Sequence, residues 1–229
     1  MEEIIHFDKH LLLMLNGSDS AFFDSVIMTL TTAQTWIPLY IALLYVVTIT
    51  SWHRNRPWDD ERTWRTIRDV TAILLAAGLC VLLAGTVDDE IVKPLVSRWR
   101  PTHDPEIGHL VDTVNGYRGG NYGFFSAHAA NTFSLAVFFS LLFRWSPLTC
   151  FLVCWSLTNC YTRLYLGVHY PGDIMAGLLW GGLVGWLVYR LYRRIAVPAR
   201  YPSHTLLIPI ATLCLTVAYA LVRAALETS

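Results

Sequence analysis

The chain has 229 residues, of which 54% are hydrophobic and 15% are charged. This composition excludes a disordered chain and is too apolar for an ordinary soluble domain. Seventeen Lys and Arg residues balance seventeen Asp and Glu residues. With no basic surplus, we expect no nucleic-acid partner. The five cysteines all lie in apolar stretches, which favours buried thiols over a disulfide framework or a zinc site.

A short amphipathic segment is expected at the start of the chain, over residues 3–16. Ile4, Phe7 and Leu11 recur there at helical spacing, and Asn16-Gly17 supplies a stop. The segment is too short to span a membrane. We predict a helix that lies in the membrane interface, and the alternative is a helix that docks on the rest of the fold as an apolar cap.

Six apolar runs follow, and each approaches the length that a helix needs to cross the hydrocarbon core. They lie within residues 26–52, 70–87, 127–143, 147–166, 171–192 and 205–221. We therefore predict an all-α fold, in which residues 1–229 form a single membrane domain with a bundle of six transmembrane helices. The longest polar connection, residues 93–126, is long enough to carry a functional site.

The positions of Lys and Arg predict the orientation, because short cytoplasmic loops retain these residues. If the connections after the first, third and fifth runs are inside, ten of the seventeen Lys and Arg residues are inside and seven are outside. This bias predicts that both termini, the long connection and the turn between the fourth and fifth runs lie outside the cytoplasm.

Two polar clusters flank the long connection. In the first, Lys93 is followed seven positions later by Arg100-Pro101. A basic side chain that extends to the membrane interface would explain one such cation, but it explains less well why a proline follows Arg100. In the second, Ser126 is a good N-cap, so His128 lies in the first turn of the third run. The free N–H groups there can bind an anion, although a plain capping role would also explain Ser126.

The third cluster runs from Thr162-Arg163 to His169 and Asp173. Pro171 suits the first position of a helix, which places Asp173 in the first turn, where the helix dipole favours a carboxylate. Glycines at four-residue intervals after Asp173 allow another helix to approach closely. Asp173 is therefore expected to face the bundle interior, with His169 as its partner.

Together the three clusters resemble the motifs of the type 2 phosphatidic acid phosphatase superfamily. That family carries Lys, six residues, Arg-Pro; then Pro-Ser-Gly-His; then Ser-Arg, five residues, His, three residues, Asp. The spacings match here, and the differences are Phe125, Ala127 and Thr162 in place of Pro, Gly and Ser. Because none of these removes a reacting group, we expect them to affect geometry and substrate preference.

The resemblance implies a membrane lipid phosphatase whose active-site loop is residues 93–126, with no metal and no cofactor. His169 would form a phosphohistidine, Asp173 would hold its tautomer, and His128 would act first as acid and then as base. The phosphate would be bound by Lys93, Arg100, Ser126, Ala127 and Arg163. Head-group contact is expected from Tyr117, Arg118 and Asn121, whereas His103 and His109 are expected to be solvated.

The acidic run Asp88-Asp89-Glu90 could suggest a magnesium site. However, Asp89 stands four residues before Lys93, which is the favourable order for an ion pair along a helix. We therefore expect an ion pair between Asp89 and Lys93.

A phosphate site at a membrane surface favours an amphiphilic substrate, such as undecaprenyl diphosphate, lipid A phosphate, phosphatidylglycerol phosphate or phosphatidic acid. We expect an integral protein of the bacterial cytoplasmic membrane whose site faces the periplasm or exterior, with membrane lipids and a lipid phosphate as its partners and no obligatory protein partner.

Two alternative functions stay open from the sequence. A lipid phosphotransferase would use the same residues. A non-catalytic transporter or lipid-binding protein is the alternative from another class, but charges in transporters tend to lie near mid-bilayer.

Overall fold

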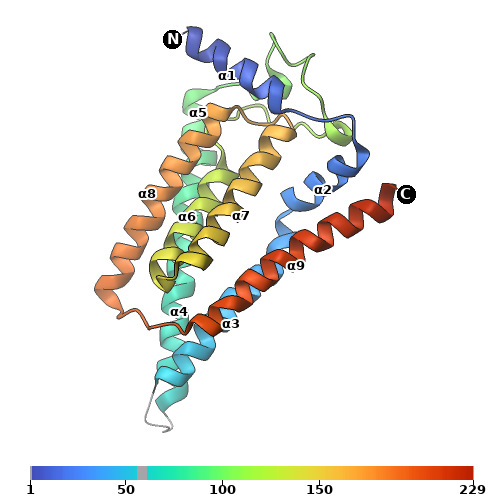
Figure 1. The fold of residues 1–229 in the computed structure, drawn as a ribbon. Coiled ribbons are helices and arrows are strands. Elements are labelled where there is room, and N and C mark those ends of the chain that lie inside the picture. Colours follow the sequence, from blue (N-terminus) through green and yellow to red (C-terminus); the bar gives the residue numbers. More distant parts are fainter. Residues whose placement is uncertain (1, 56–60, 229) are drawn as a thin grey trace.

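The structure is a computed structural model that describes residues 2–55 and 61–228. Every regular element within these ranges is a helix (Figure 1), as the composition predicts. Beside the helices, one isolated bridge pairs Trp99 with Tyr122 in the long connection. The α-helices are α1 (Glu2–Leu15), α2 (Ala21–Thr31), α3 (Ile37–Arg54), α4 (Glu61–Val81), α5 (Lys93–Val96), α6 (Ala127–Phe143), α7 (Ser146–Tyr165), α8 (Pro171–Ile195) and α9 (Ser203–Thr228).

All six apolar runs form helices, but the first run is divided between α2 and α3. A 3-10 turn, Ala33–Trp36, separates the two helices, and a proline stands in the first turn of α3. The second run is longer than predicted, since α4 continues through two π-helical stretches, Leu82–Thr86 and Asp88–Val92, into α5. Such π-helical turns are often found at functional sites.

Several of these helices are long and apolar, which supports an integral membrane protein. Within the described ranges, four segments are long and apolar enough to cross a membrane, and they are Ala33–Arg54, Glu61–Val96, Pro171–Ile195 and Ser203–Thr228. The helices α2 and α6 are apolar but shorter. The count of six spans therefore stays a prediction.

Close packing between α6 and α8 brings their N-terminal ends together. A Cβ atom on Gly177 would lie 2.7 Å from the backbone oxygen of Ser126, and one on Gly181 or Gly185 would collide with the backbone of α6. The glycine stripe that the sequence singles out is thus the contact surface of α8. It places His128, in the first turn of α6, beside the start of α8.

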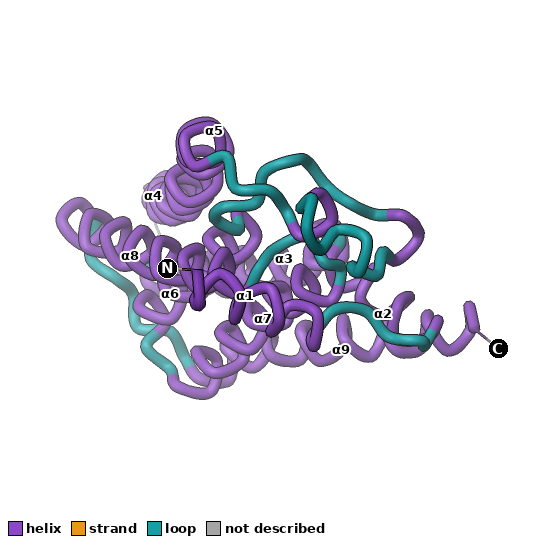
Figure 2. The backbone as a smooth tube through the Cα atoms, turned by 90° about the horizontal axis from the view of Figure 1, so that it is seen from above, coloured by secondary structure: helices purple, strands orange, loops and turns teal. Residues whose placement is uncertain are grey.

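The helix α1 lies across one end of the bundle, next to the long connection (Figures 1 and 2). Leu12 is fully buried and packs with Ile107, Val111 and Tyr170. The opposite side of α1 leaves Ile4 and other large hydrophobic side chains exposed. The helix therefore docks on the bundle, as in the alternative considered from sequence, and its position in the membrane interface stays a prediction.

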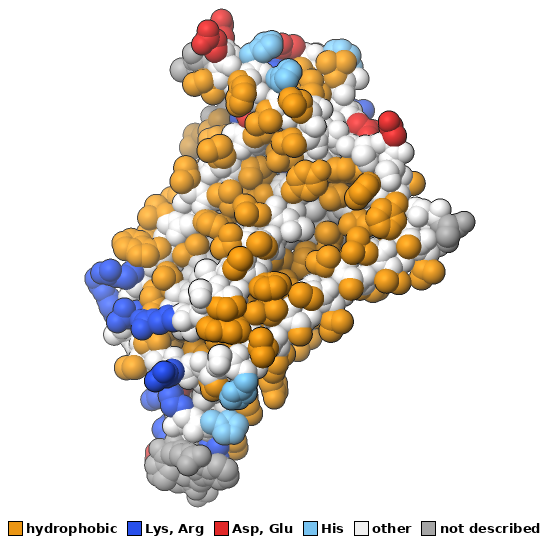
Figure 3. Space-filling view, viewed as in Figure 1, with side chains coloured by type: hydrophobic (Ala, Val, Ile, Leu, Met, Phe, Trp, Pro, Cys, Tyr) orange, Lys and Arg blue, Asp and Glu red, His pale blue; other side chains and the backbone are white. Residues whose placement is uncertain are grey.

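The two ends of the molecule differ in charge. Figure 3 shows hydrophobic side chains over the middle of the visible face, with Lys and Arg gathered toward the end away from α1 and acidic side chains at the α1 end. This distribution follows the Lys and Arg asymmetry of the sequence. Which end faces the cytoplasm stays a prediction.

Candidate active site

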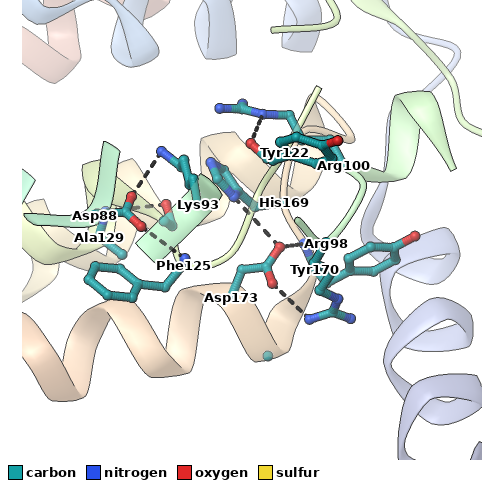
Figure 4. Close-up of polar contacts among 12 residues, drawn as sticks. Asp88, Lys93, Arg98, Arg100, Tyr122, Phe125, Ala129, His169, Tyr170 and Asp173 are labelled. Carbon is teal, nitrogen blue, oxygen red and sulfur yellow. Dashed lines mark hydrogen bonds and ion pairs between the residues drawn. The ribbon is translucent and has the colours of Figure 1, made fainter. Parts of the chain in front are cut away.

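The three sequence clusters converge at the end of the bundle where α5, α6 and α8 meet the long connection. Figure 4 shows Lys93, Arg100, His169 and Asp173 gathered there. Lys93 begins α5, His128 lies in the first turn of α6, and His169 stands just before α8. His128 is within electrostatic reach of His169 and of the three cations Lys93, Arg100 and Arg163. Residues up to 76 positions apart in sequence therefore share one small volume.

His169 and Asp173 are both buried, with side-chain exposures of 2% and 0%. Nδ1 of His169 lies 3.6 Å from Oδ2 of Asp173, which is too long for a hydrogen bond. Within the described chain, Nδ1 has no hydrogen-bond partner. The predicted pairing of the two side chains is thus a close contact in this state of the protein, and it needs a shift of less than 1 Å to become a hydrogen bond.

The surroundings of His169 favour its neutral form. Burial lowers the pKa of His169 well below its usual 6.5, and the charges of Arg100, Arg163 and Lys93 lower it further. Each of these causes disfavours a positive charge on the imidazole. A neutral imidazole keeps one ring nitrogen free to act as a nucleophile.

Asp173 is held by Arg98, which lies outside the His169 motif, and by a backbone N–H within that motif. Its Oδ1 accepts a hydrogen bond from Nη1 of Arg98 at 2.7 Å, and its Oδ2 accepts one from the backbone N–H of Tyr170 at 2.9 Å. The second nitrogen of Arg98, Nη2, binds Oδ2 of Asp8 in α1 at 2.6 Å. The sequence motifs predict neither Arg98 nor Asp8 as part of the site, although Arg98 stands only two positions before Arg100.

Arg163 is almost fully buried, and one of its three guanidinium nitrogens has no partner among the described residues. Its Nη1 binds the hydroxyl of Thr31 at 2.7 Å, and its Nη2 binds the hydroxyl of Tyr117 at 3.0 Å. Its Nε is buried and has no partner in the described part of the chain. A buried charged donor without a partner is costly, so this position suits an anion.

Arg100 is wrapped by the second half of the long connection. Its Nε donates to the backbone oxygen of Tyr122 at 3.0 Å, and its backbone N–H donates to the backbone oxygen of Asn121 at 2.9 Å. Gly119 has a φ of +68°, and a Cβ atom there would lie 2.7 Å from Nη1 of Arg100. Glycine at this position therefore allows the chain to pass close to the guanidinium group.

Lys93 is ion-paired with two carboxylates. It binds Asp89, as predicted, and its Nζ also lies 2.8 Å from Oδ2 of Asp88. Asp88 is fully buried, and its Oδ1 accepts the backbone N–H of Phe125 at 3.0 Å. Asp88 thus connects Lys93 to the segment that leads into Ser126, a role that the sequence analysis did not foresee.

Ser126 caps α6, as predicted. Its Oγ accepts the backbone N–H of Ala129 at 3.4 Å, and its own N–H donates to the backbone oxygen of Asp173 at 3.1 Å. The second contact joins the starts of α6 and α8. Ala127 is the first residue of α6 and is half-buried. Phosphate binding by Ser126 and Ala127 stays a prediction.

The head-group candidates lie in the loop beside these residues. Tyr117 contacts Arg163 directly, with the guanidinium 5.6 Å from the ring centre. Arg118 and Asn121 have exposed side chains, and their backbone oxygens bind Thr102 and Arg100. His109 is exposed and His103 is half-buried beside Thr102.

In the described ranges, no group of three or more His, Cys, Asp or Glu side chains could hold a metal ion.

Comparison with known proteins identifies the family. The model of the PAP2 superfamily matches residues 69–196. The chain is 40% identical over 207 residues to a lipid A 4′-phosphatase of Bacteroides thetaiotaomicron, covering 90% of this chain and 84% of that protein. It is 34% identical over 209 residues to a lipid A 4′-phosphatase of Porphyromonas gingivalis, covering 89% and 82%.

The fold is similar to that of a transmembrane PAP2-type phosphatidylglycerolphosphate phosphatase from Bacillus subtilis. The TM-score to that crystal structure is 0.56 at 17% sequence identity, over 86% of this chain and 89% of the other. The structural likeness supports the fold, and the sequence matches identify the family. The chain therefore belongs to the PAP2 superfamily.

Proposed function

We propose that this protein hydrolyses a lipid phosphate at the outer face of the membrane through a phosphohistidine on His169. Family membership and the lipid A 4′-phosphatase relatives support a membrane lipid phosphatase. The observation that carries the mechanism is a buried histidine whose pKa is lowered by burial and by the nearby cations Arg100, Arg163 and Lys93.

The first step transfers the phosphoryl group to His169. The free nitrogen, Nε2, attacks phosphorus while Nδ1 carries the proton and points toward Asp173. The bond between phosphorus and the lipid oxygen breaks, and His128 donates a proton to that oxygen. Lys93, Arg100 and Arg163 stabilise the charge on the non-bridging oxygens, with Nε of Arg163 as one free donor.

The second step releases inorganic phosphate. His128, now neutral, accepts a proton from a water molecule that attacks phosphorus, and the bond between phosphorus and Nε2 breaks. General acid and base catalysis of this kind contributes about 10²- to 10⁴-fold to the rate. Asp173 stabilises the imidazolium character that His169 gains while it carries the phosphoryl group.

Among the candidate substrates we favour the 4′-phosphate of lipid A. Two relatives that this chain matches over more than four fifths of their length carry that activity in their names. We place the protein in a bacterial cytoplasmic membrane with its site toward the periplasm, and we propose that catalysis needs no metal. The proposed anion-binding groups are Lys, Arg, Ser and backbone N–H groups, which bind phosphate directly.

The test measures release of inorganic phosphate by the purified protein in detergent with EDTA present. The panel contains lipid A, phosphatidylglycerol phosphate, phosphatidic acid and undecaprenyl diphosphate, and position-specific loss from lipid A is read by mass spectrometry. We expect loss of the 4′-phosphate, and acid-labile labelling of His169 in a quenched reaction. Activity that disappears in EDTA and returns with magnesium would contradict metal independence, and transfer to a second lipid without phosphate release would indicate a phosphotransferase.

A further inference from the structure

Asp173 depends on a charge contact that reaches it from the N-terminal helix. Arg98 uses one guanidinium nitrogen for Asp173 and another for Asp8 of α1, at 2.7 and 2.6 Å. Figure 4 shows the guanidinium beneath Asp173 and beside Tyr170. Arg98 also lies over the ring of Tyr170, 4.3 Å from its centre. One planar cation therefore bridges two carboxylates from distant segments.

Both oxygens of Asp8 contact groups around the active site. Oδ2 binds Arg98, and Oδ1 accepts the backbone N–H of Gly172 in the first turn of α8 at 2.8 Å. A Cβ atom on Gly172 would lie 2.9 Å from Oδ2 of Asp8, so this approach requires glycine or a displaced carboxylate. Asp8 thus fixes the direction of Arg98 and the start of α8 at the same time.

The contact orients Asp173 toward His169. With Oδ1 bound to Arg98 and Oδ2 bound to the N–H of Tyr170, the plane of the carboxylate is fixed. In that orientation Oδ2 is the oxygen that faces Nδ1 of His169. The backbone oxygen of Arg98 also accepts the N–H of Gly123 at 2.9 Å, which ties the same residue to the loop around Arg100.

Contacts other than the Asp8–Arg98 pair also dock α1 on the bundle. Lys9 binds Asp104 and Glu106 at 3.0 and 2.6 Å, and Leu12 is buried against the long connection. These contacts hold the helix in place, whereas Asp8 contacts the groups that hold Asp173. Because Asp8 is 8% exposed, its charge is largely removed from water and depends on the pairing with Arg98.

We propose that Asp8 and Arg98 are positioning residues, and that α1 is a functional part of the active site because its Asp8 holds Arg98 against Asp173. This inference rests on the proposed phosphatase mechanism. Neither residue touches the phosphate: both act on His169 through Asp173. Loss of the pair lets the carboxylate rotate away from His169, which lowers kcat while the cations that bind the phosphate stay in place.

The experiment compares Asp8→Asn, Arg98→Gln and the double variant, using phosphate release from the best lipid substrate by the full-length protein in detergent. Asn at position 8 keeps the size of the side chain and an oxygen for the N–H of Gly172, but it lacks the charge. We expect Asp8→Asn to lower kcat about 10-fold and Arg98→Gln about 100-fold, since small misplacements of reacting groups have effects of this order. KM should stay within about twofold, because binding of the phosphate is unchanged.

The double variant tests whether Asp8 acts through Arg98. We expect it to be no slower than Arg98→Gln alone, because the charge of Asp8 then has no guanidinium to hold, and Asn at position 8 still accepts the N–H of Gly172. Asp8→Glu should recover part of the lost kcat. The matched control is Glu3→Gln, an exposed carboxylate on the same helix, which should behave as wild type. Thermal unfolding and gel filtration of each variant report any loss of folding.

Three outcomes would overturn the inference. One is wild-type kcat in Asp8→Asn, another is losses that multiply in the double variant, and the third is an effect confined to KM. If Asp8→Asn does not fold, Arg98→Lys takes its place, because a lysine cannot bridge two carboxylates with a planar fork; wild-type kcat there would also contradict the inference. A wild-type protein that releases no phosphate from any lipid would instead refute the proposed function.

Discussion

Two buried carboxylates lie on opposite sides of the site, Asp88 on the α4 side and Asp173 on the α8 side. Each accepts a backbone N–H and pairs with a cation: Asp88 with Phe125 N–H and Lys93, Asp173 with Tyr170 N–H and Arg98. The arrangement is the same, but the cation differs in role. Lys93 is a proposed phosphate ligand, whereas Arg98 holds the carboxylate that faces His169.

On the proposed mechanism, the same kind of buried ion pair serves substrate binding on one side of the site and catalysis on the other. On the α4 side the carboxylate holds the proposed phosphate ligand Lys93, and on the α8 side Arg98 holds the carboxylate that faces the proposed nucleophile His169. Substitutions on the two sides should therefore separate in KM and kcat.

His169→Ala tests the α8 side most directly. We expect turnover to fall by at least about 10⁴-fold, as for the loss of other covalent nucleophiles. The side chain is buried, but the residue stands in the turn before α8 and not within a helix, so the variant should remain monodisperse in detergent. Phosphate release is measured on the same lipid as for wild type. Near wild-type release from a folded variant would rule out the phosphohistidine.

His128→Ala tests the histidine in the first turn of α6. Its side chain lies within electrostatic reach of Lys93 on the α4 side and of His169 on the α8 side. We expect phosphate release from a lipid substrate to fall about 10³-fold, because proton donation to the leaving oxygen is lost. With nitrophenyl phosphate the loss should be smaller, since that leaving group needs little protonation. The ratio of the two losses is the measurement. Equal losses on both substrates would remove His128 from the acid role.

Asp173→Asn tests whether the α8 carboxylate serves His169. We expect kcat to fall about 100-fold, because the tautomer and the imidazolium are no longer stabilised. The pH profile of kcat/KM gives a second readout. Burial and the surrounding cations lower the pKa of His169, so the acidic limb of the wild type should lie below pH 6.5. This acidic limb marks the protonation of His169, which must be neutral to react.

Removing the negative charge of Asp173 lowers the pKa of His169 further, so the acidic limb of Asp173→Asn should move to still lower pH. An unchanged limb together with an undiminished maximal rate would show that Asp173 acts only as a helix cap. Because the histidines are coupled, each limb belongs to the pair His128 and His169. The comparison of variant and wild type is therefore more informative than either profile alone.

Asp88→Asn tests the α4 side and is expected to have the smallest effect. The amide keeps an oxygen for the N–H of Phe125 but no longer pairs with Lys93, which Asp89 still binds. We expect KM to rise about 10-fold with kcat changed by less than about threefold, since the cation is misplaced in ground and transition states alike. A large kcat defect with unchanged KM would show that the two sides are not separate.

Features that depend on neighbouring residues could be predicted from the sequence. The helical ion pair of Asp89 with Lys93, the cap at Ser126 and the glycine stripe from Gly177 are all readable, because each arises within one helix at three- or four-residue spacing. The Ser126 cap and Pro171 also predicted that His128 and Asp173, two proposed site residues, lie in the first turns of helices. The helical course of the six apolar runs could likewise be predicted from hydropathy.

Which distant groups meet at those helix ends depends on tertiary packing and could not be predicted from the sequence. Arg98 and Asp8 are 90 positions apart, Asp88 and Phe125 are 37 apart, and Arg163 and Thr31 are 132 apart. No local periodicity connects such pairs, since they meet through the packing of α6 on α8 and the docking of α1. A buried carboxylate must be paired with the donors that this packing supplies, which is why the charged partner of Asp173, Arg98, was found in the structure and not in the motif of Asp173.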